Sequence, residues 1–259
     1  MKITFVIISV SDRVESLNLL LETIMRNKQF DDYDINLLYQ DYLGNADQIK
    51  YKSRYAGIYV YKEKLGCHGA RVTLLRQLEG KGYEVYVNLD DDMELIPQTN
   101  YVRAIEKALC KDVGFVLTNW ARTEALAQQK IPKMSDIFAK QIMIYQGGGM
   151  VYSEKIAKLM RGLPVCHSEF DDIWPLTSYI NGYDNYKDFS SIAIHHVCGK
   201  GGMRSYMKEQ KRPLLCKDYI DYKYGRNGTE VLIPLDKDVN EKARLLHREN
   251  RERILKGDK

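Results

Sequence analysis

Along the first hundred residues, short continuous apolar runs alternate with segments in which apolar residues recur at helical spacing. Residues 3–10 form an uninterrupted run rich in β-branched side chains, which is typical of a parallel strand covered on both faces. Between positions 14 and 24 the apolar residues recur at helical spacing. Further patterns predict a helix at 66–78 and strands at 34–40, 57–61 and 83–89. This alternation predicts an α/β fold with a doubly wound, mostly parallel sheet.

The second half of the chain has a more mixed pattern. A helix is expected at 99–110, a strand at 113–118 and a helical or mobile excursion at 122–140. The later elements are a short strand, two helices and a late strand, at 150–152, 153–160, 168–181 and 192–197. The charged tail at 237–256 is expected to be helical.

Acidic residues follow the predicted strands at the points where these strands end. Asp12, Asp41 and the run Asp90-Asp91-Asp92 all occupy such positions. In open α/β sheets, ligands bind beyond the carboxyl ends of the strands. The sequence therefore predicts a ligand site at this edge of the sheet.

The run Asp90-Asp91-Asp92 is the strongest candidate for chemistry. Three consecutive carboxylates after a buried strand repel one another unless a cation offsets their charge. Oxygen ligands of this kind suit Mg²⁺ or Mn²⁺, and Asp90 and Asp92 can converge on one ion at a strand end. The alternative interpretation is a solvated acidic turn or a helix cap.

A longer stretch carries a resemblance to a known family. Its parts are Leu65-Gly66-Cys67-His68-Gly69-Ala70-Arg71, a helix, a strand, and Leu89-Asp90-Asp91-Asp92 with Pro97 downstream. In this order they resemble the core of GT-A glycosyltransferases, especially the inverting family 2. The resemblance covers residues 3–98 closely and 145–198 loosely. It implies a GT-A fold, with a Rossmann-like, mostly parallel sheet flanked by helices, and transfer of a hexosyl or pentosyl group from a nucleotide sugar.

The resemblance also implies roles on the donor side. Asp90 would contact the ribose or the metal, and Asp92 would ligate the Mn²⁺ or Mg²⁺ that bridges the diphosphate. Asp41 would lie where such enzymes hold the nucleobase. The Gly199-Lys200-Gly201-Gly202 loop offers amides and a cation to the leaving group. The full set of expected donor-binding residues is Ser9, Asp12, Asp41, Arg71, Asp90, Asp91 and Lys200.

Acceptor-side residues follow from the same resemblance. A glycine segment borders the acceptor sugar in the family, so we expect Gly148, Gly149 and Trp174 to contact the acceptor. Inverting transfer needs a carboxylate that takes the proton from the acceptor hydroxyl. Asp171 and Asp172 are the candidates for this base, and Glu169 stays open. Asp171 could instead form a helix-capping pair with Ser168.

A late histidine often completes the metal site in this family. His195 and His196 lie on the predicted late strand, where neighbouring side chains face opposite sides. Only one of them can therefore ligate the ion, and we favour His196.

Two positions depart from the family pattern. Val72 stands where Asn is frequent after Ala-Arg, and Asp41-Tyr42-Leu43-Gly44 replaces the usual Asp-Gly-Ser. Both departures bear on the donor nucleotide, for which UDP is the expectation.

The chain is expected to form one domain with three parts. These are a nucleotide-sugar-binding half at 1–98, an acceptor-binding and catalytic half at 99–235, and a charged helix at 236–259. Residues 199–226 carry eight basic and three acidic side chains, hence net +5, with tyrosines between them. Such a segment suits an anionic saccharide acceptor, or a hydroxymethylated DNA base of the sort that bacteriophages glucosylate.

The composition indicates whether the chain has a membrane-spanning helix and in which cellular compartment it is expected. The 259 residues contain no apolar run near the roughly 18 residues that a membrane-spanning helix needs. Five dispersed cysteines without metal-site spacing indicate reduced thiols in a cytoplasm, either bacterial or that of a host if the chain is phage-encoded. The alternative function is a nucleic-acid- or sugar-binding module that kept the GT-A fold and lost catalysis.

Overall fold

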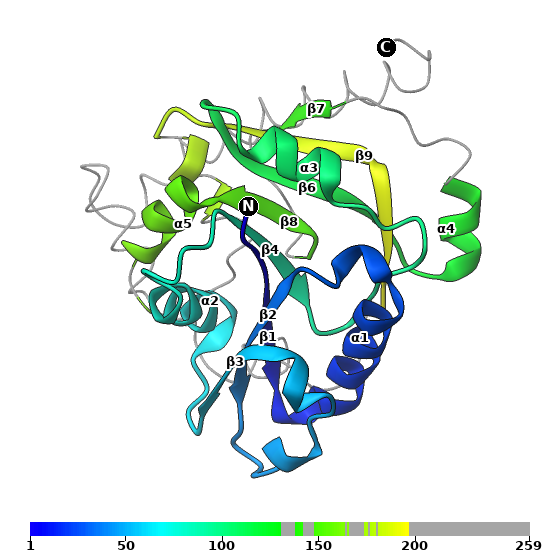
Figure 1. Ribbon diagram of the computed structural model, residues 1–259, viewed down its shortest axis with the longest axis vertical. Helices are drawn as coiled ribbons and strands as arrows, with labels where there is room; N and C mark the ends of the chain where they lie inside the picture. Colours follow the sequence, from blue (N-terminus) through cyan, green and yellow to red (C-terminus); the bar gives the residue numbers. More distant parts are fainter. Residues whose placement is uncertain are drawn as a thin grey trace, which may run out of the picture.

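The computed structural model describes residues 1–130, 138–141, 148–163, 165, 174–175, 177–179 and 181–196 (Figure 1). The first half contains β1 (Ile3–Val10), α1 (Val14–Arg26), β2 (Asp34–Gln40), β3 (Tyr55–Tyr61), α2 (Gly66–Gln77), β4 (Val85–Asp90) and β5 (Met93–Glu94). The second half contains α3 (Val102–Ala108), β6 (Val113–Ala121), α4 (Glu124–Lys130), β7 (Phe138–Gln141), β8 (Met150–Ser153), α5 (Glu154–Arg161) and β9 (Asp184–His195).

Nine strands of the described residues form one sheet, in the order β3-β2-β1-β4-β8-β6-β9-β5, with β7 paired to β9. β1 pairs in parallel with both β2 and β4, and β2 pairs in parallel with β3. β8 is antiparallel to its two neighbours, whereas β6 and β9 are parallel. The structure thus confirms the predicted α/β class, with a parallel first half and a mixed second half.

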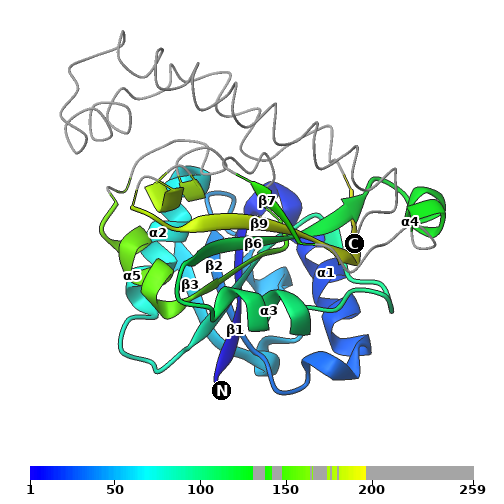
Figure 2. The ribbon, with the colours of Figure 1, turned by 90° about the horizontal axis from the view of Figure 1, so that it is seen from above.

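Helices cover both faces of the sheet because its central strands are apolar on both sides. In β1, Phe5 and Ile7 lie in a core cluster with residues of α1 and α3. The alternate residues Val6 and Ile8 lie in a second cluster with residues of α2 and α5. Figure 2 shows these helices on opposite sides of the strands. This packing leaves the carboxyl ends of β1, β2 and β4 at one edge, where the acidic residues lie.

The late strand differs most from the sequence expectation. β9 begins at Asp184, eight residues before the predicted start at 192. Its first part, Asp184–Ser191, mixes aromatic and polar residues, several of which are buried between β6 and β7. The predicted excursion at 122–140 contains the helix α4 and the start of β7. Because packing against neighbouring strands buries polar side chains of β9, the first part of this strand does not appear as an apolar run in the sequence.

Several expectations fall outside the described residues. These are the basic segment at 199–226 and the helix at 236–259, so the division of the chain into three parts stays a prediction. Among the residues that are described, none of the helices has both the length and the apolar character needed to cross a membrane.

Candidate functional site

The short strand β5 brings two distant segments together at the edge of the sheet. β4 ends at Asp90, and the chain turns through Asp91 and Asp92 into β5. β5 pairs antiparallel with the end of β9, which places Met93 opposite His195. In addition, the backbone N–H of His196 donates to the carbonyl of Asp92 over 2.8 Å. The acidic turn is therefore held against the last residue of β9.

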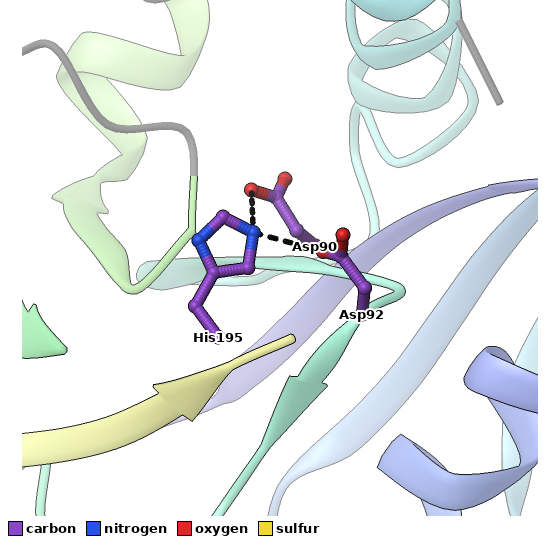
Figure 3. Close-up of side chains that lie close together, drawn as sticks. All are labelled: Asp90, Asp92 and His195. Carbon is purple, nitrogen blue, oxygen red and sulfur yellow. Dashed lines mark hydrogen bonds and ion pairs between the residues drawn. The ribbon is translucent and has the colours of Figure 1, made fainter. Parts of the chain in front are cut away.

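Asp90, Asp92 and His195 form a cluster at this junction (Figure 3). One ligand atom from each lies within 4.8 Å of the others. Nε2 of His195 is 2.9 Å from Oδ1 of Asp92 and 4.0 Å from Oδ2 of Asp90. Two carboxylates and one imidazole suit a divalent ion such as Mn²⁺, so this donor set fits the metal expected from the sequence.

Two arginines hold the outer oxygens of the two aspartates. Nη2 of Arg71 lies 2.5 Å from Oδ1 of Asp90, and Nη1 of Arg13 lies 3.3 Å from Oδ2 of Asp92. In each aspartate the other oxygen is the one nearest to His195. The arginines therefore fix the carboxylates with one oxygen of each turned towards the imidazole.

The charges in the cluster stabilise one another. Burial works to raise the pKa of Asp92, but the hydrogen bond with His195 and the charges of His195 and Arg13 outweigh it, and the pKa is lowered. Burial works to lower the pKa of His195, yet the hydrogen bond with Asp92 and the charge of Asp90 raise it. The hydrogen bond with Asp92 and the two nearby carboxylates thus favour the protonated form of the His195 imidazole.

Asp91 is buried and does not belong to this cluster. Its side chain is 6% exposed, accepts a hydrogen bond of 2.7 Å from Ser9 and lies 2.9 Å from Nη1 of Arg13. Burial raises the pKa of Asp91 to about 6, with Arg13 acting against that rise. The expected donor-binding residues Ser9 and Asp91 therefore contact each other, and Asp91 pairs with Arg13.

Of the two glycines expected on the acceptor side, Gly148 lies beside Asp90 of the cluster and Gly149 lies beside Thr118. A Cβ at Gly148 would meet Sδ of Met93 at 2.4 Å and Oδ2 of Asp90 at 3.1 Å. Gly149 has a φ of +74°, and a Cβ there would meet Oγ1 of Thr118 at 2.3 Å. A side chain at Gly148 would therefore need Met93 to shift and Asp90 to give slightly.

Asp12 and Asp41 lie at the ends of β1 and β2, beside Tyr42. The Tyr42 hydroxyl donates to Oδ2 of Asp12 over 2.5 Å. Asp41 is buried and accepts from the Asn45 backbone N–H over 2.7 Å, while Nζ of Lys62 lies 3.1 Å from its other oxygen. Both carboxylates are thus already engaged by groups of the protein.

Two expectations change when the side chains are placed. Nε2 of His196 lies 2.8 Å from Oε2 of Glu94, outside the cluster, so that His195 takes the position expected for His196. Trp174 is fully buried, and its indole N–H donates to Nδ1 of His68 over 3.1 Å. The structure thus places Trp174 in a core cluster with residues of α2 and α5. The base candidates Asp171 and Asp172, the alternative Glu169 and the donor residue Lys200 lie outside the described residues.

No protein-family model and no curated protein match this sequence. Solved structures do resemble its fold. The S. aureus TarS fragment 1–349 has 15% identity and a TM-score of 0.53 over 76% of this chain. The mannosyltransferase PcManGT from Pyrobaculum calidifontis, in complex with GDP-Man and Mn²⁺, has 17% identity and a TM-score of 0.60 over 95% of this chain and 68% of its own. The structure of GalNAc-T7 with UDP, GalNAc and Mn²⁺ has 12% identity and a TM-score of 0.56 over 76% of this chain.

This chain has the GT-A glycosyltransferase fold. It spans 60% of the TarS fragment and 44% of GalNAc-T7. The sequence pattern of this GT-A chain does not single out Arg13, and it favours His196, whereas the cluster contains His195. The signal for Arg13 was its position directly after the first strand, beside Asp12. The signal for His195 was the register between β5 and β9, which the sequence pattern does not reveal.

Proposed function

We propose that this chain is a metal-dependent glycosyltransferase that moves a sugar from a nucleotide sugar to an acceptor hydroxyl. The observation that carries the proposal is the cluster of Asp90, Asp92 and His195 at the edge of a GT-A sheet. Two of the solved neighbours hold Mn²⁺ with GDP-Man or with UDP and GalNAc, and a TarS structure holds UDP-GlcNAc. We therefore expect a UDP- or GDP-sugar donor.

Asp90, Asp92 and His195 would hold Mn²⁺ or Mg²⁺, and we assign this role to His195 in place of His196. Bound there, the ion would offset the charge of the diphosphate leaving group. Arg13 and Arg71 keep the two carboxylates turned towards the imidazole. Asp41 and Tyr42 would border the nucleobase at the end of β2.

For the transfer itself we propose direct displacement with inversion. The acceptor oxygen bonds to the anomeric carbon while the bond from that carbon to the diphosphate oxygen breaks. The acceptor proton passes to Asp171 or Asp172, with Glu169 as the alternative base. Gly148, which lies beside Asp90, and Gly149 would border the acceptor.

Two acceptor classes fit the sequence, and both are proposals. One is a saccharide hydroxyl, and the other is the hydroxymethyl group of a modified DNA base, which the basic and tyrosine-rich segment at 199–226 would bind. The anomeric configuration of the product, read by NMR, tests inversion. A retained configuration contradicts the assignment of a carboxylate base.

The proposal is tested by the release of nucleoside diphosphate from a panel of UDP- and GDP-hexoses and pentoses in the presence of Mn²⁺. We expect turnover by the wild type, its loss in Asp92→Ala, and its retention in Asp47→Ala, which changes an exposed aspartate. Binding of a donor without turnover, across the whole panel and with both acceptor classes present, would support a binding module instead.

A further inference from the structure

Trp120 is a large aromatic side chain beside the cluster that no step of the proposed function uses. It lies on β6, one residue before the end of the strand. Its ring centroid is 5.3 Å from that of His195, with the two planes at 83°. The indole is therefore in edge-to-face contact with one of the three residues that would hold the ion.

The strand register places Trp120 on the same face of the sheet as His195. In the parallel pair of β6 and β9, Trp120 is opposite Ala193, and Ala121 is opposite Ile194. Ala121 and Ile194 belong to a core cluster on one face. Because successive side chains alternate, Trp120 and His195 both lie on the other face.

Trp120 is not part of the hydrophobic core of the described residues. It belongs to none of the three core clusters, nor to the partly buried residues that pack against them. The side chain is half-buried, in contrast to Trp174, which is fully buried. A large apolar ring that stays partly exposed beside a polar cluster is a typical surface for a ligand with both apolar and polar faces.

We propose that Trp120 is the platform on which the sugar of the donor packs. This inference rests on the proposed function, since a diphosphate at Asp90, Asp92 and His195 carries its sugar one bond away. A hexopyranose has a face on which its C–H bonds gather, and this face is apolar. That face packs on the indole, while the hydroxyl groups at its rim point to water and to the polar side chains of the cluster.

The platform makes a specific prediction about affinity. On this proposal, Trp120 contacts the sugar and does not contact the nucleotide. Its removal should therefore weaken the binding of a nucleotide sugar more than the binding of the free nucleoside diphosphate. In the presence of Mn²⁺, we expect Trp120→Ala to bind UDP and GDP within twofold of the wild type. The same variant should bind the preferred nucleotide sugar about tenfold more weakly, with Trp120→Phe between the two.

The experiment is calorimetric titration of the wild type, Trp120→Ala and Trp120→Phe with UDP-glucose, UDP-GlcNAc and GDP-mannose, using UDP and GDP as the matched ligands. A second readout is tryptophan fluorescence, because Trp120 and Trp174 are the two tryptophans of the chain. In Trp174→Phe the emission comes from Trp120 alone, and a nucleotide sugar should change it more than the matching nucleoside diphosphate does.

Two results would overturn the inference while leaving the proposed function intact. One is an unchanged affinity of Trp120→Ala for the nucleotide sugar. The other is an equal loss for UDP and for the nucleotide sugar, which would mean that Trp120 acts by holding His195 in place. Failure of the wild type to bind any of these ligands with Mn²⁺ would remove the proposed function, and the platform with it.

Discussion

Nη2 of Arg71 lies 2.5 Å from Oδ1 of Asp90 and thereby joins α2 to the end of β4. The side chain of Arg71 is 2% exposed, and that of Asp90 is 21% exposed. A guanidinium buried this deeply beside a carboxylate is a fixed part of the protein. The pair explains why an arginine follows the Gly-Ala segment at the start of this helix.

Replacement of Arg71 should therefore cost stability as well as metal affinity. We expect Arg71→Met to lower the free energy of unfolding by about 2 kcal/mol or more, because it leaves Asp90 without its partner. The measurement is urea denaturation. Arg26→Met is the matched control, since Arg26 pairs with Glu22 on the surface and its side chain is 73% exposed. Equal losses in the two variants would contradict the account.

The carboxylate of Asp41 should make stability depend on pH. Burial works to raise its pKa, but hydrogen bonds from Lys62 and the Asn45 backbone outweigh it and lower the pKa below 3.8. A lowered folded-state pKa gives stability that is present above the unfolded value and lost as the pH falls through the folded value. The wild type should thus exceed Asp41→Asn in unfolding free energy at pH 6, and the difference should shrink below pH 4. A difference that grows with acidification would be inconsistent with this pairing.

Gly148 should control the position of Asp90. A methyl group there would meet Sδ of Met93 at 2.4 Å and Oδ2 of Asp90 at 3.1 Å, so that one of the two must move. We expect Gly148→Ala to weaken Mn²⁺ binding about tenfold, as changes beside metal ligands commonly do. Adding Met93→Ala opens space and should restore part of the affinity. Calorimetric titration with Mn²⁺ is the measurement, and an unchanged affinity in Gly148→Ala would count against the site.

Trp174 should behave as a core residue. Its ring stacks near Phe115 and meets Tyr152 edge to face, and its N–H donates to His68. Trp174→Ala should lower the free energy of unfolding by about 3–5 kcal/mol, and Trp174→Phe by clearly less. Thermal and urea denaturation measure both variants. Full stability in Trp174→Ala, with a higher acceptor KM, would restore the acceptor role that the sequence suggested.

Much of the fold of the first half of the chain could be predicted, because its central strands are continuous apolar runs. β1 and β2 have the expected bounds, and the run Asp90-Asp91-Asp92 follows β4 as expected. These features depend on local pattern alone. The convergence of Asp90 and Asp92 also follows, since both residues belong to the turn at the end of β4.

The rest depends on contacts between distant segments. Arg13 meets Asp91 across 78 positions, and the choice between His195 and His196 depends on the two residues of β5. Trp174 looks like a binding residue in the sequence, because the pattern does not show which side of its segment faces the core. Such pairings follow from the tertiary packing and not from the spacing of residues.

Asp90, Asp92 and His195 are proposed to hold a divalent ion that the donor's diphosphate needs. The most direct test of this proposal is Mn²⁺ binding, followed by electron paramagnetic resonance, in His195→Ala and His196→Ala. The two histidines are adjacent, and His196 pairs with Glu94 outside the cluster, so each variant is the control for the other. The account predicts a loss of at least tenfold in Mn²⁺ affinity for His195→Ala and little change for His196→Ala. The reverse order, or equal affinities in both variants and the wild type, would contradict it.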